Sequence, residues 1–380
     1  MFSLPPLFQG PSSLQAVVAV AVLTAVLCCV FAPRTAVAHE NVYTKERGVR
    51  ALYIFGDSLV DVGNNHYLPL SIIRADFPHN GIDFPGKKAT GRFSNGKNAA
   101  DFIAMNLGLE SPPAYLSLSD APDRTRTFLA GVNFASGGAG ISDDTARELE
   151  QCLPVNKQLD YFSEVRQALV CQLGVEKAKK HLSRSLFVLV IGSNDIFRYV
   201  KCEHECPLQL FVDSMALALE RQLKRMHDLG ARMLVFVGTG PVGCCPSHRV
   251  WNKTGDCHDL ANHISLRYNE AVYRVLQKIK AERGDFCYSF FDTYKVVMDY
   301  IQNPEAYGFA EGRAACCGLG TLNAKVACLP ISSFCDDRKA HVFWDFHHPT
   351  ERTYEMLANV IFRGSKEYVF PVNAGQLTSL

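Results

Sequence analysis

The sequence predicts an α/β fold built around a parallel sheet, and three patterns support this class. Five short apolar runs do not alternate with polar residues, as is typical of strands that are covered on both faces. Amphipathic helical patterns separate the runs, which indicates β-α-β units. Polar residues and glycines follow the runs, at the strand ends where open α/β sheets bind their ligands. The runs are residues 51–55, 132–135, 186–191, 233–237 and 286–290.

Three helical patterns are the clearest. Apolar residues recur at helical spacing from 211 to 226, and Gly230 ends that pattern. A second pattern runs from 264 to 279, and a third covers about residues 350–362. The chain shows no internal repeat and no linker rich in proline or serine. We therefore expect a single domain over residues 39–380.

The first 38 residues belong to a separate category. Residues 14–32 are nearly all Ala, Val, Leu and Cys, and Ala36-Val37-Ala38 follows them. This pattern predicts a signal peptide over residues 1–38, although its start carries no Lys or Arg. A retained membrane anchor is the alternative. No other apolar run approaches the ~20 residues that a membrane span needs, so we expect no stable membrane insertion of the mature chain.

The net charge and the number of cysteines in the mature chain indicate which partners and which compartment to expect. Cleavage removes Arg34, which changes the formal net charge from +1 to 0, and a neutral chain is not expected to bind nucleic acid. Of 14 cysteines, Cys28 and Cys29 leave with the signal peptide. The even number that remains predicts disulfides and an oxidising compartment. Asn252 begins an N-x-T glycosylation acceptor.

The disulfide pattern is only partly predictable. We expect Cys257 to pair with Cys244 or Cys245. A second group, which would hold the long loop before the C-terminal helix, pairs Cys316 and Cys317 with Cys328 and Cys335.

Residues 202–206 read Cys-Glu-His-Glu-Cys, which are metal-ligand types. The H-E-x-x-H pattern of catalytic zinc sites is missing. In an exported chain we expect a Cys202–Cys206 bridge, or bridges to other cysteines, instead of a metal site. No metal and no cofactor are expected.

The first strand end carries a candidate nucleophile. Ser58 follows Gly56-Asp57, and a tight turn after a strand exposes such a hydroxyl. A helix N-cap is the alternative, because Ser and Asp are both good caps.

Two further strand ends carry candidate donors. Residues 133–140 read NFASGGAG, and Gly137 and Gly138 let backbone N–H groups approach a ligand closely. A phosphate loop would need a different glycine spacing or a lysine. Asn194, in VIGSNDIF, offers the side-chain N–H that stabilises an oxyanion, although Asn is also an ordinary turn residue.

The last segment, FWDFHHPTERTY, carries a candidate acid and base. Asp345 lies three residues before His348, so its carboxylate can reach the imidazole and hold its tautomer. His347 competes for the role, but it lies only two residues from Asp345 and we expect it to point elsewhere. A surface turn is the alternative. Together the segments supply the groups that acyl transfer needs.

Four blocks, FGDSLVDVGNN, GVNFASGGAGI, IGSNDI and FWDFHHPT, resemble those of the plant GDSL esterase/lipases, a branch of the SGNH hydrolases. The resemblance covers residues 53–362, within a catalytic core of about residues 51–364. It implies a three-layer α/β/α sandwich of flavodoxin-like type with about five parallel strands.

The resemblance also implies roles for individual residues. Ser58 would be the nucleophile, His348 the base and Asp345 the residue that orients His348. The oxyanion hole would use the N–H groups of Ser58 and Gly137, with Gly138 as the second choice, and the amide of Asn194.

The resulting hypothesis is a secreted serine esterase, extracellular or in the cell wall, that hydrolyses acyl esters through an acyl-enzyme. Its substrate would be a small lipid or acylated sugar, and the protein would be a monomer. An acyltransferase that uses the same residues and an inactive binding protein are the alternatives. Specificity would depend on loops such as residues 69–91 and 142–154, which the blocks do not describe.

Overall fold

The computed structural model describes residues 48–119, 121, 124–145, 151–202 and 206–379. Residues Arg47–Leu380 form one compact unit. The predicted signal peptide lies outside the described residues. Among the helices that the structure describes, none is both long and apolar enough to cross a bilayer.

The central sheet has six strands in the order β10-β5-β4-β3-β1-β2. The five strands β1 to β5 pair in parallel, in the flavodoxin-like order 2-1-3-4-5. This confirms the predicted fold class. The edge strand β10 pairs antiparallel to β5 and was not predicted. The strands are β1 (Leu52–Gly56), β2 (Gly131–Asn133), β3 (Leu186–Val190), β4 (Met233–Val237), β5 (Cys287–Phe291) and β10 (Val369–Phe370).

The apolar runs form strands because both faces of the sheet are buried. Successive residues of a strand point to opposite faces, and β1 shows this directly. Tyr53 and Phe55 enter one apolar core, whereas Leu52 and Ile54 enter the other. Polar residues within such a strand would be buried on either face, which explains the lack of alternation in the sequence.

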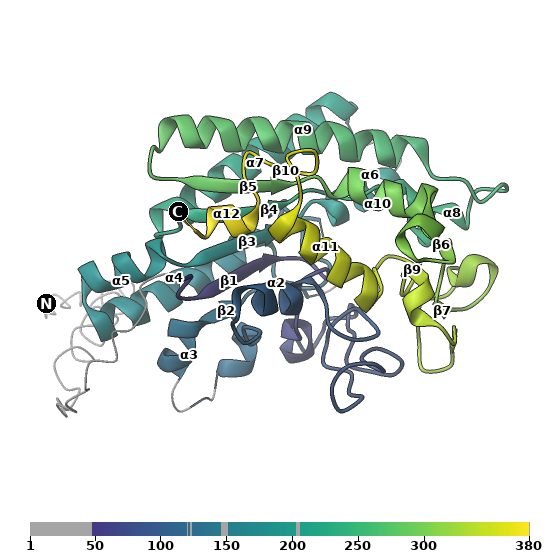
Figure 1. Cartoon of the computed structure of the whole chain (residues 1–380), viewed down its shortest axis with the longest axis horizontal. Helices are drawn as coiled ribbons and strands as arrows, with labels where there is room; N and C mark the ends of the chain where they lie inside the picture. Colours follow the sequence, from purple (N-terminus) through teal and green to yellow (C-terminus); the bar gives the residue numbers. More distant parts are fainter. Residues whose placement is uncertain (1–47, 120, 122–123, 146–150, 203–205, 380) are drawn as a thin grey trace, which may run out of the picture. The chain divides into compact units, whose positions relative to one another are not determined.

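Helices cover both faces of the sheet and complete the three layers. One core lies against α3, α4, α5, α7 and α9, and the other lies against α2, α10, α11 and α12. In Figure 1, α11 and α12 cross in front of the strands. These helices are α2 (Ala99–Leu107), α3 (Arg124–Ala130), α4 (Val155–Leu173), α5 (Val175–Ser183), α7 (Leu208–Asp228), α9 (Asp259–Glu282), α10 (Thr293–Gln302), α11 (Glu351–Arg363) and α12 (Ala374–Leu377).

Short elements connect the layers near the carboxyl ends of the strands. Helix α6 (Ser193–Lys201) begins directly after β3, and α8 (Pro246–Arg249) follows β4. Two small ribbons precede α11. They are β6 (Glu311–Ala315) with β9 (His341–Phe343), and β7 (Cys317–Gly318) with β8 (Ser333–Phe334).

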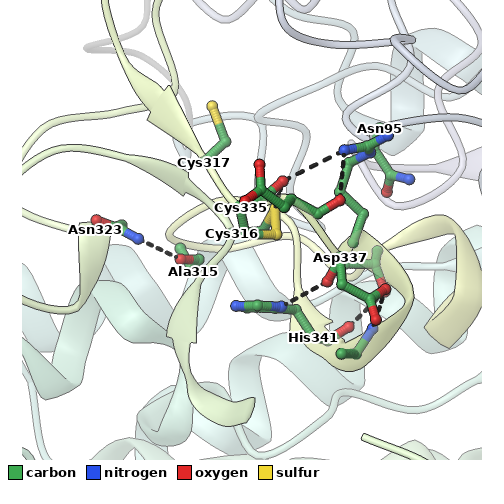
Figure 2. Close-up of a disulfide and its surroundings, with 12 residues drawn as sticks. Asn95, Ala315, Cys316, Cys317, Asn323, Cys335, Asp337 and His341 are labelled. Atoms are coloured by element: carbon green, nitrogen blue, oxygen red, sulfur yellow. Dashed lines mark hydrogen bonds between the residues drawn. A yellow bond between two sulfur atoms is a disulfide. The ribbon is translucent and has the colours of Figure 1, made fainter. Parts of the chain in front are cut away.

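Two neighbouring disulfides hold the segment that carries these ribbons. Cys316 is bonded to Cys335, and Cys317 is bonded to Cys328. Figure 2 shows the sulfur of Cys317 turned away from the Cys316–Cys335 pair. The expected pairing of this group is confirmed.

The remaining cysteine expectations have different outcomes. Cys257 pairs with Cys244, while Cys245 is a buried free thiol. The predicted Cys202–Cys206 bridge and the alternative of bridges to other cysteines are both wrong, because both residues are free thiols. Cys202 caps the end of α6, whereas Cys206 packs against the apolar cluster that α6, α7 and α9 share. Glu203, His204 and Glu205 lie outside the described residues.

Replacing both Cys317 and Cys328 with Ser should lower the free energy of unfolding by ~3 kcal/mol. Without the bridge, the unfolded chain gains the conformational entropy that closing this loop had removed. The bridge closes a separation of 11 residues. Denaturant unfolding of the variant and of the unaltered protein measures this difference. A Cys245→Ser variant is the matched control, since this thiol forms no disulfide, and an equal loss in both variants would contradict the prediction.

Candidate active site

Ser58 lies on a tight turn at the carboxyl end of β1. The turn requires Gly56, which has φ of 145° and whose added Cβ would lie 2.2 Å from the Val190 carbonyl oxygen. The Asp57 side chain accepts a hydrogen bond from the Leu59 N–H at 3.0 Å, and its backbone carbonyl accepts one from Val60. Burial raises the pKa of Asp57 to about 7, although the Leu59 hydrogen bond lowers it. The turn thus presents the Ser58 hydroxyl at the sheet edge.

The segment before α11 brings an imidazole to this hydroxyl. The His348 Nε2 lies 2.8 Å from the Ser58 Oγ, and the His348 Nδ1 lies 2.8 Å from each carboxylate oxygen of Asp345. All three residues are buried. With its proton on Nδ1, the ring donates to Asp345 and its Nε2 is free to accept the Ser58 proton.

Asp345 is built to stay ionised. Burial by itself raises its pKa, but the nearby charge of His348 and the hydrogen bonds from His348 and from the His347 N–H outweigh burial, so the pKa lies below its usual value. The His347 N–H and the His348 N–H both donate to Oδ1 at 2.8 Å. A fixed carboxylate of this kind stabilises an imidazolium at His348.

His347 is directed elsewhere, as its spacing predicted. Its ring packs against Phe197 and Phe346, with ring centroids 4.4 and 4.1 Å apart. Loss of water around the ring, together with the nearby His348, lowers the pKa of His347 to about 3. A group with so low a pKa is a poor base near neutral pH.

The two glycines of the glycine block differ in whether the backbone N–H already has an acceptor. The N–H without an acceptor is not that of Gly137, which was the first choice from the sequence. The Gly137 N–H donates to the Asp61 carboxylate at 3.0 Å, so this group is already used. The Gly138 N–H has no acceptor among the described residues, and Gly138 lines the cavity that contains Ser58. Gly138 has φ of 83°, a conformation that favours glycine. The geometry therefore favours Gly138 over Gly137 as a donor.

Asn194 and Ser58 offer two more donors to the same cavity. Asn194 lies in the first turn of α6, and its Nδ2 donates to the Ala139 carbonyl at 2.9 Å. An amide nitrogen carries two hydrogens, so a second donor remains. The Ser58 N–H also has no acceptor among the described residues. Three donors can thus face an oxygen bound near the Ser58 Oγ.

Two residues of the first block, Asp61 and Asn65, were not assigned a role from the sequence. The Asn65 Nδ2 donates to the Gly137 carbonyl at 2.9 Å, and the Asp61 carboxylate accepts from Gly137 on its other side. Asp61 also accepts from the backbone N–H groups of Gly63 and Asn64. Residues 61–65, DVGNN, lie close to Ser58 in the sequence, but no local pattern in them predicts contacts with the glycine block.

A cavity of about 460 Å³ opens beside these groups. Its lining includes Ser58, Gly138, Asn194 and His348 together with many apolar side chains. Among the described residues, no group of three or more His, Cys, Asp or Glu side chains could hold a metal ion. The site therefore combines a hydroxyl, an imidazole, a carboxylate and several N–H donors beside an apolar space.

Parallel strands in the order 2-1-3-4-5, with helices on both faces and these residues at the carboxyl edge, are the arrangement expected of an SGNH hydrolase. The sequence comparisons place the chain within that class. Residues 52–361 match the family model described as GDSL-like Lipase/Acylhydrolase, and the chain belongs to this family. It is accordingly a carboxylic ester hydrolase.

Two of the relatives are plant proteins. GDSL esterase/lipase At5g55050 of Arabidopsis thaliana is 45% identical over 344 residues, which cover 88% of this chain and 91% of the relative. GDSL esterase/lipase At5g37690 of the same plant is 40% identical, with 82% and 87% covered. A solved structure of a catalytic mutant of Axe2, an acetylxylan esterase from Geobacillus stearothermophilus, is 15% identical with a TM-score of 0.37, covering 84% of this chain and 96% of that one.

Proposed function

We propose that this protein hydrolyses acyl esters by nucleophilic catalysis, with Ser58 as nucleophile, His348 as base and Asp345 as the residue that orients the base. The observation that supports this most directly is the unbroken chain of 2.8 Å contacts from the Ser58 Oγ through the His348 ring to the Asp345 carboxylate. Such a chain activates a hydroxyl that is otherwise a weak nucleophile.

In the proposed reaction, the Ser58 Oγ attacks the ester carbonyl and its proton moves to the His348 Nε2. The resulting oxyanion accepts hydrogen bonds from the N–H groups of Ser58 and Gly138 and from the Asn194 amide. His348 then donates its proton to the leaving alcohol. Water attacks the acyl-enzyme with His348 again acting as base, which releases the acid and restores Ser58.

An acyl-enzyme on Ser58 is the species that tests this proposal. Rapid acid quench of the purified protein with p-nitrophenyl butyrate, followed by peptide mass spectrometry, should find the butyryl group on the peptide that contains Ser58. Acylation of another residue, or no ester turnover at all, would refute the proposal. Adding an alcohol acceptor during turnover separates hydrolysis from acyl transfer, because a transferase would form the new ester at low acceptor concentration.

We also propose that the protein is secreted after loss of residues 1–38, with residues 39–380 as a single hydrolase domain. The three disulfides of the described residues support an oxidising compartment. Asn252 is exposed in a turn, so its side chain is accessible for glycosylation, and its Oδ1 accepts a hydrogen bond from the Thr254 N–H. N-terminal sequencing and glycosidase treatment of the secreted protein test both statements.

Asn194→Ala should lower kcat by about 10²–10³-fold, because one donor to the oxyanion is lost while the nucleophile and base remain. Steady-state kinetics with p-nitrophenyl butyrate measures the change. Asn106→Ala is a matched control, since this amide lies on α2 and bonds a backbone carbonyl away from the cavity. A kcat within threefold of the unaltered protein in Asn194→Ala would remove this residue from the oxyanion hole.

A further inference from the structure

We propose that Asp195 is a positioning residue that holds the glycine block at the distance from α6 that the oxyanion donors require. This inference rests on the proposed function, because it assumes that the donors include the Gly138 N–H and the Asn194 amide. Asp195 does not line the cavity that contains Ser58. It would therefore act through the loop formed by residues 139–145, which we call the 139–145 loop.

Both carboxylate oxygens of Asp195 bind the 139–145 loop. The Oδ2 accepts a hydrogen bond from the Ile141 N–H at 3.0 Å, and the Oδ1 accepts one from the Ser142 N–H at 3.2 Å. The Thr145 hydroxyl also donates to the Oδ1. Asp195 is only 3% exposed, so water competes little for these bonds. Three donors of one loop therefore share a single buried carboxylate in the first turn of α6.

Asn194, the residue before Asp195, binds the same loop through its amide. Its Nδ2 donates to the Ala139 carbonyl at 2.9 Å. The two hydrogens of this nitrogen have a fixed angle between them, so the position of the Ala139 carbonyl decides where the second hydrogen points. Ile141 follows Ala139 by two residues, and its N–H is bound to Asp195. Asp195 thus limits how far the Ala139 carbonyl can move from α6.

Gly138 lies between two points at which the glycine block is held. On one side, the Gly137 N–H donates to the Asp61 carboxylate at 3.0 Å. On the other side, Asp195 holds Ile141 across a separation of 54 residues. A donor whose backbone is fixed on both sides needs no rearrangement when an oxyanion forms, which is why such donors are effective. Release of the second side would let the Gly138 N–H change direction.

The 139–145 loop is closely packed at its centre. Ile141 is buried, and its carbonyl accepts from the Gln222 Nε2 of α7 at 2.8 Å. A Cβ on Gly140 would lie 2.4 Å from the Thr145 Cβ. Without the carboxylate, the Ile141 N–H would be a buried donor that has lost its acceptor, which is unfavourable. The loop is therefore expected to shift when Asp195 is replaced.

The negative charge of Asp195 has the opposite effect on catalysis from its contacts. An ionised carboxylate near the site repels a developing oxyanion. Burial is the main cause of the raised pKa of Asp57, and the charge of Asp195 adds to it, so this charge acts as far as the turn that carries Ser58. Removing the charge alone should therefore raise kcat, whereas losing the contacts to the loop should lower kcat. The sign of the change separates the two contributions.

Asp195→Asn keeps one oxygen and replaces the other with an NH2 group, which cannot accept a hydrogen bond from an N–H. We expect kcat for p-nitrophenyl butyrate to fall by about 10- to 100-fold, because the oxyanion donors are misplaced. KM should change by less than about threefold, since these donors act mainly on the transition state. Inhibition by butylboronic acid, which forms a tetrahedral anion on serine, should weaken to a similar extent as kcat.

Asp143→Asn is the matched control, because Asp143 is an exposed carboxylate of the same loop and does not line the cavity. It accepts from the Asn156 side chain at 3.0 Å, and we expect its replacement to leave kcat close to that of the unaltered protein. An unchanged or increased kcat in Asp195→Asn would overturn the proposal. A lower kcat with boronate inhibition retained, or an equal loss in Asp143→Asn, would also overturn it.

Gly140→Ala disturbs the same contacts without altering any charge, and it keeps the proposal testable if Asp195→Asn does not fold. The added Cβ would displace Thr145 from the Asp195 carboxylate. We expect kcat and boronate inhibition to weaken together by about tenfold. Gly284→Ala is the control, because its added Cβ would meet nothing within 4 Å. If Gly140→Ala keeps both kcat and boronate inhibition, the loop does not need this packing and the proposal fails.

Formation of the acyl-enzyme separates this inference from the proposed chemistry. Asp195→Asn retains Ser58 and His348, so acid quench with p-nitrophenyl butyrate should still find the butyryl group on the Ser58 peptide, formed more slowly. If the unaltered protein forms no acyl-enzyme, the proposed function fails, whatever the variants show. If Asp195→Asn forms it as fast as the unaltered protein, the proposed function stands and only the positioning role of Asp195 is refuted.

Discussion

Ser58→Ala is expected to lower kcat for ester hydrolysis by about 10⁵–10⁶-fold, which is the scale on which removal of a serine nucleophile acts elsewhere. The variant loses the atom that forms the acyl-enzyme, and the Oγ is the group that the His348 Nε2 contacts at 2.8 Å. What activity remains would come from binding and from the oxyanion donors. The residual rate is measured from p-nitrophenol release in an assay with p-nitrophenyl butyrate at high enzyme concentration.

The variant should fold normally. Ser58 is 8% exposed and its side chain contributes one hydroxyl, whose loss leaves no large cavity. We expect thermal unfolding within a few degrees of the unaltered protein. Turnover above one tenth of the original, in protein free of the unaltered enzyme, would show that another residue is the nucleophile.

Asp345→Asn should lower kcat by about 10⁴-fold, because it changes the tautomer of His348 and leaves its position nearly unaltered. The carboxylate accepts from the His348 Nδ1, so the Nε2 faces Ser58 without a proton. An Asn amide turned toward Nδ1 would donate instead, which places the ring proton on Nε2. His348 could then no longer accept the Ser58 proton.

The control for this variant is a carboxylate from a nearby segment. Asp336 is exposed, and Asp336→Asn removes one negative charge without touching the imidazole. Steady-state kinetics of both variants over a range of pH separates the local effect from the change in net charge. A kcat within tenfold in Asp345→Asn, or an equal loss in Asp336→Asn, would contradict the proposed role of Asp345.

The sequence predicted most regular elements because their signals are local. The run at residues 233–237 coincides with β4, and the helical pattern from 211 to 226 lies inside α7. The run at residues 132–135 is less well placed, since β2 is Gly131–Asn133. Strand β10 carried no signal, because two residues are too few to show a periodicity.

The candidate site was predictable to the level of residue type. The blocks indicated Ser58, Asp345, His348 and Asn194, and the structure brings all four to one cavity. The choice between Gly137 and Gly138 was not predictable, because it depends on where each peptide N–H points. For Gly137, the N–H is directed to the Asp61 carboxylate, a contact across 76 residues of sequence.

By itself, the sequence determined the fold class, the order of the main strands and helices, and the candidate residues of the site, because periodicity and short motifs are properties of neighbouring residues. Tertiary structure alone decided that the Gly137 N–H bonds to Asp61, that Cys257 pairs with Cys244, that Cys202 and Cys206 remain unbonded, and which residues line the cavity beside Ser58. These features depend on distances and directions between segments far apart in the chain, and only packing of the whole domain fixes them.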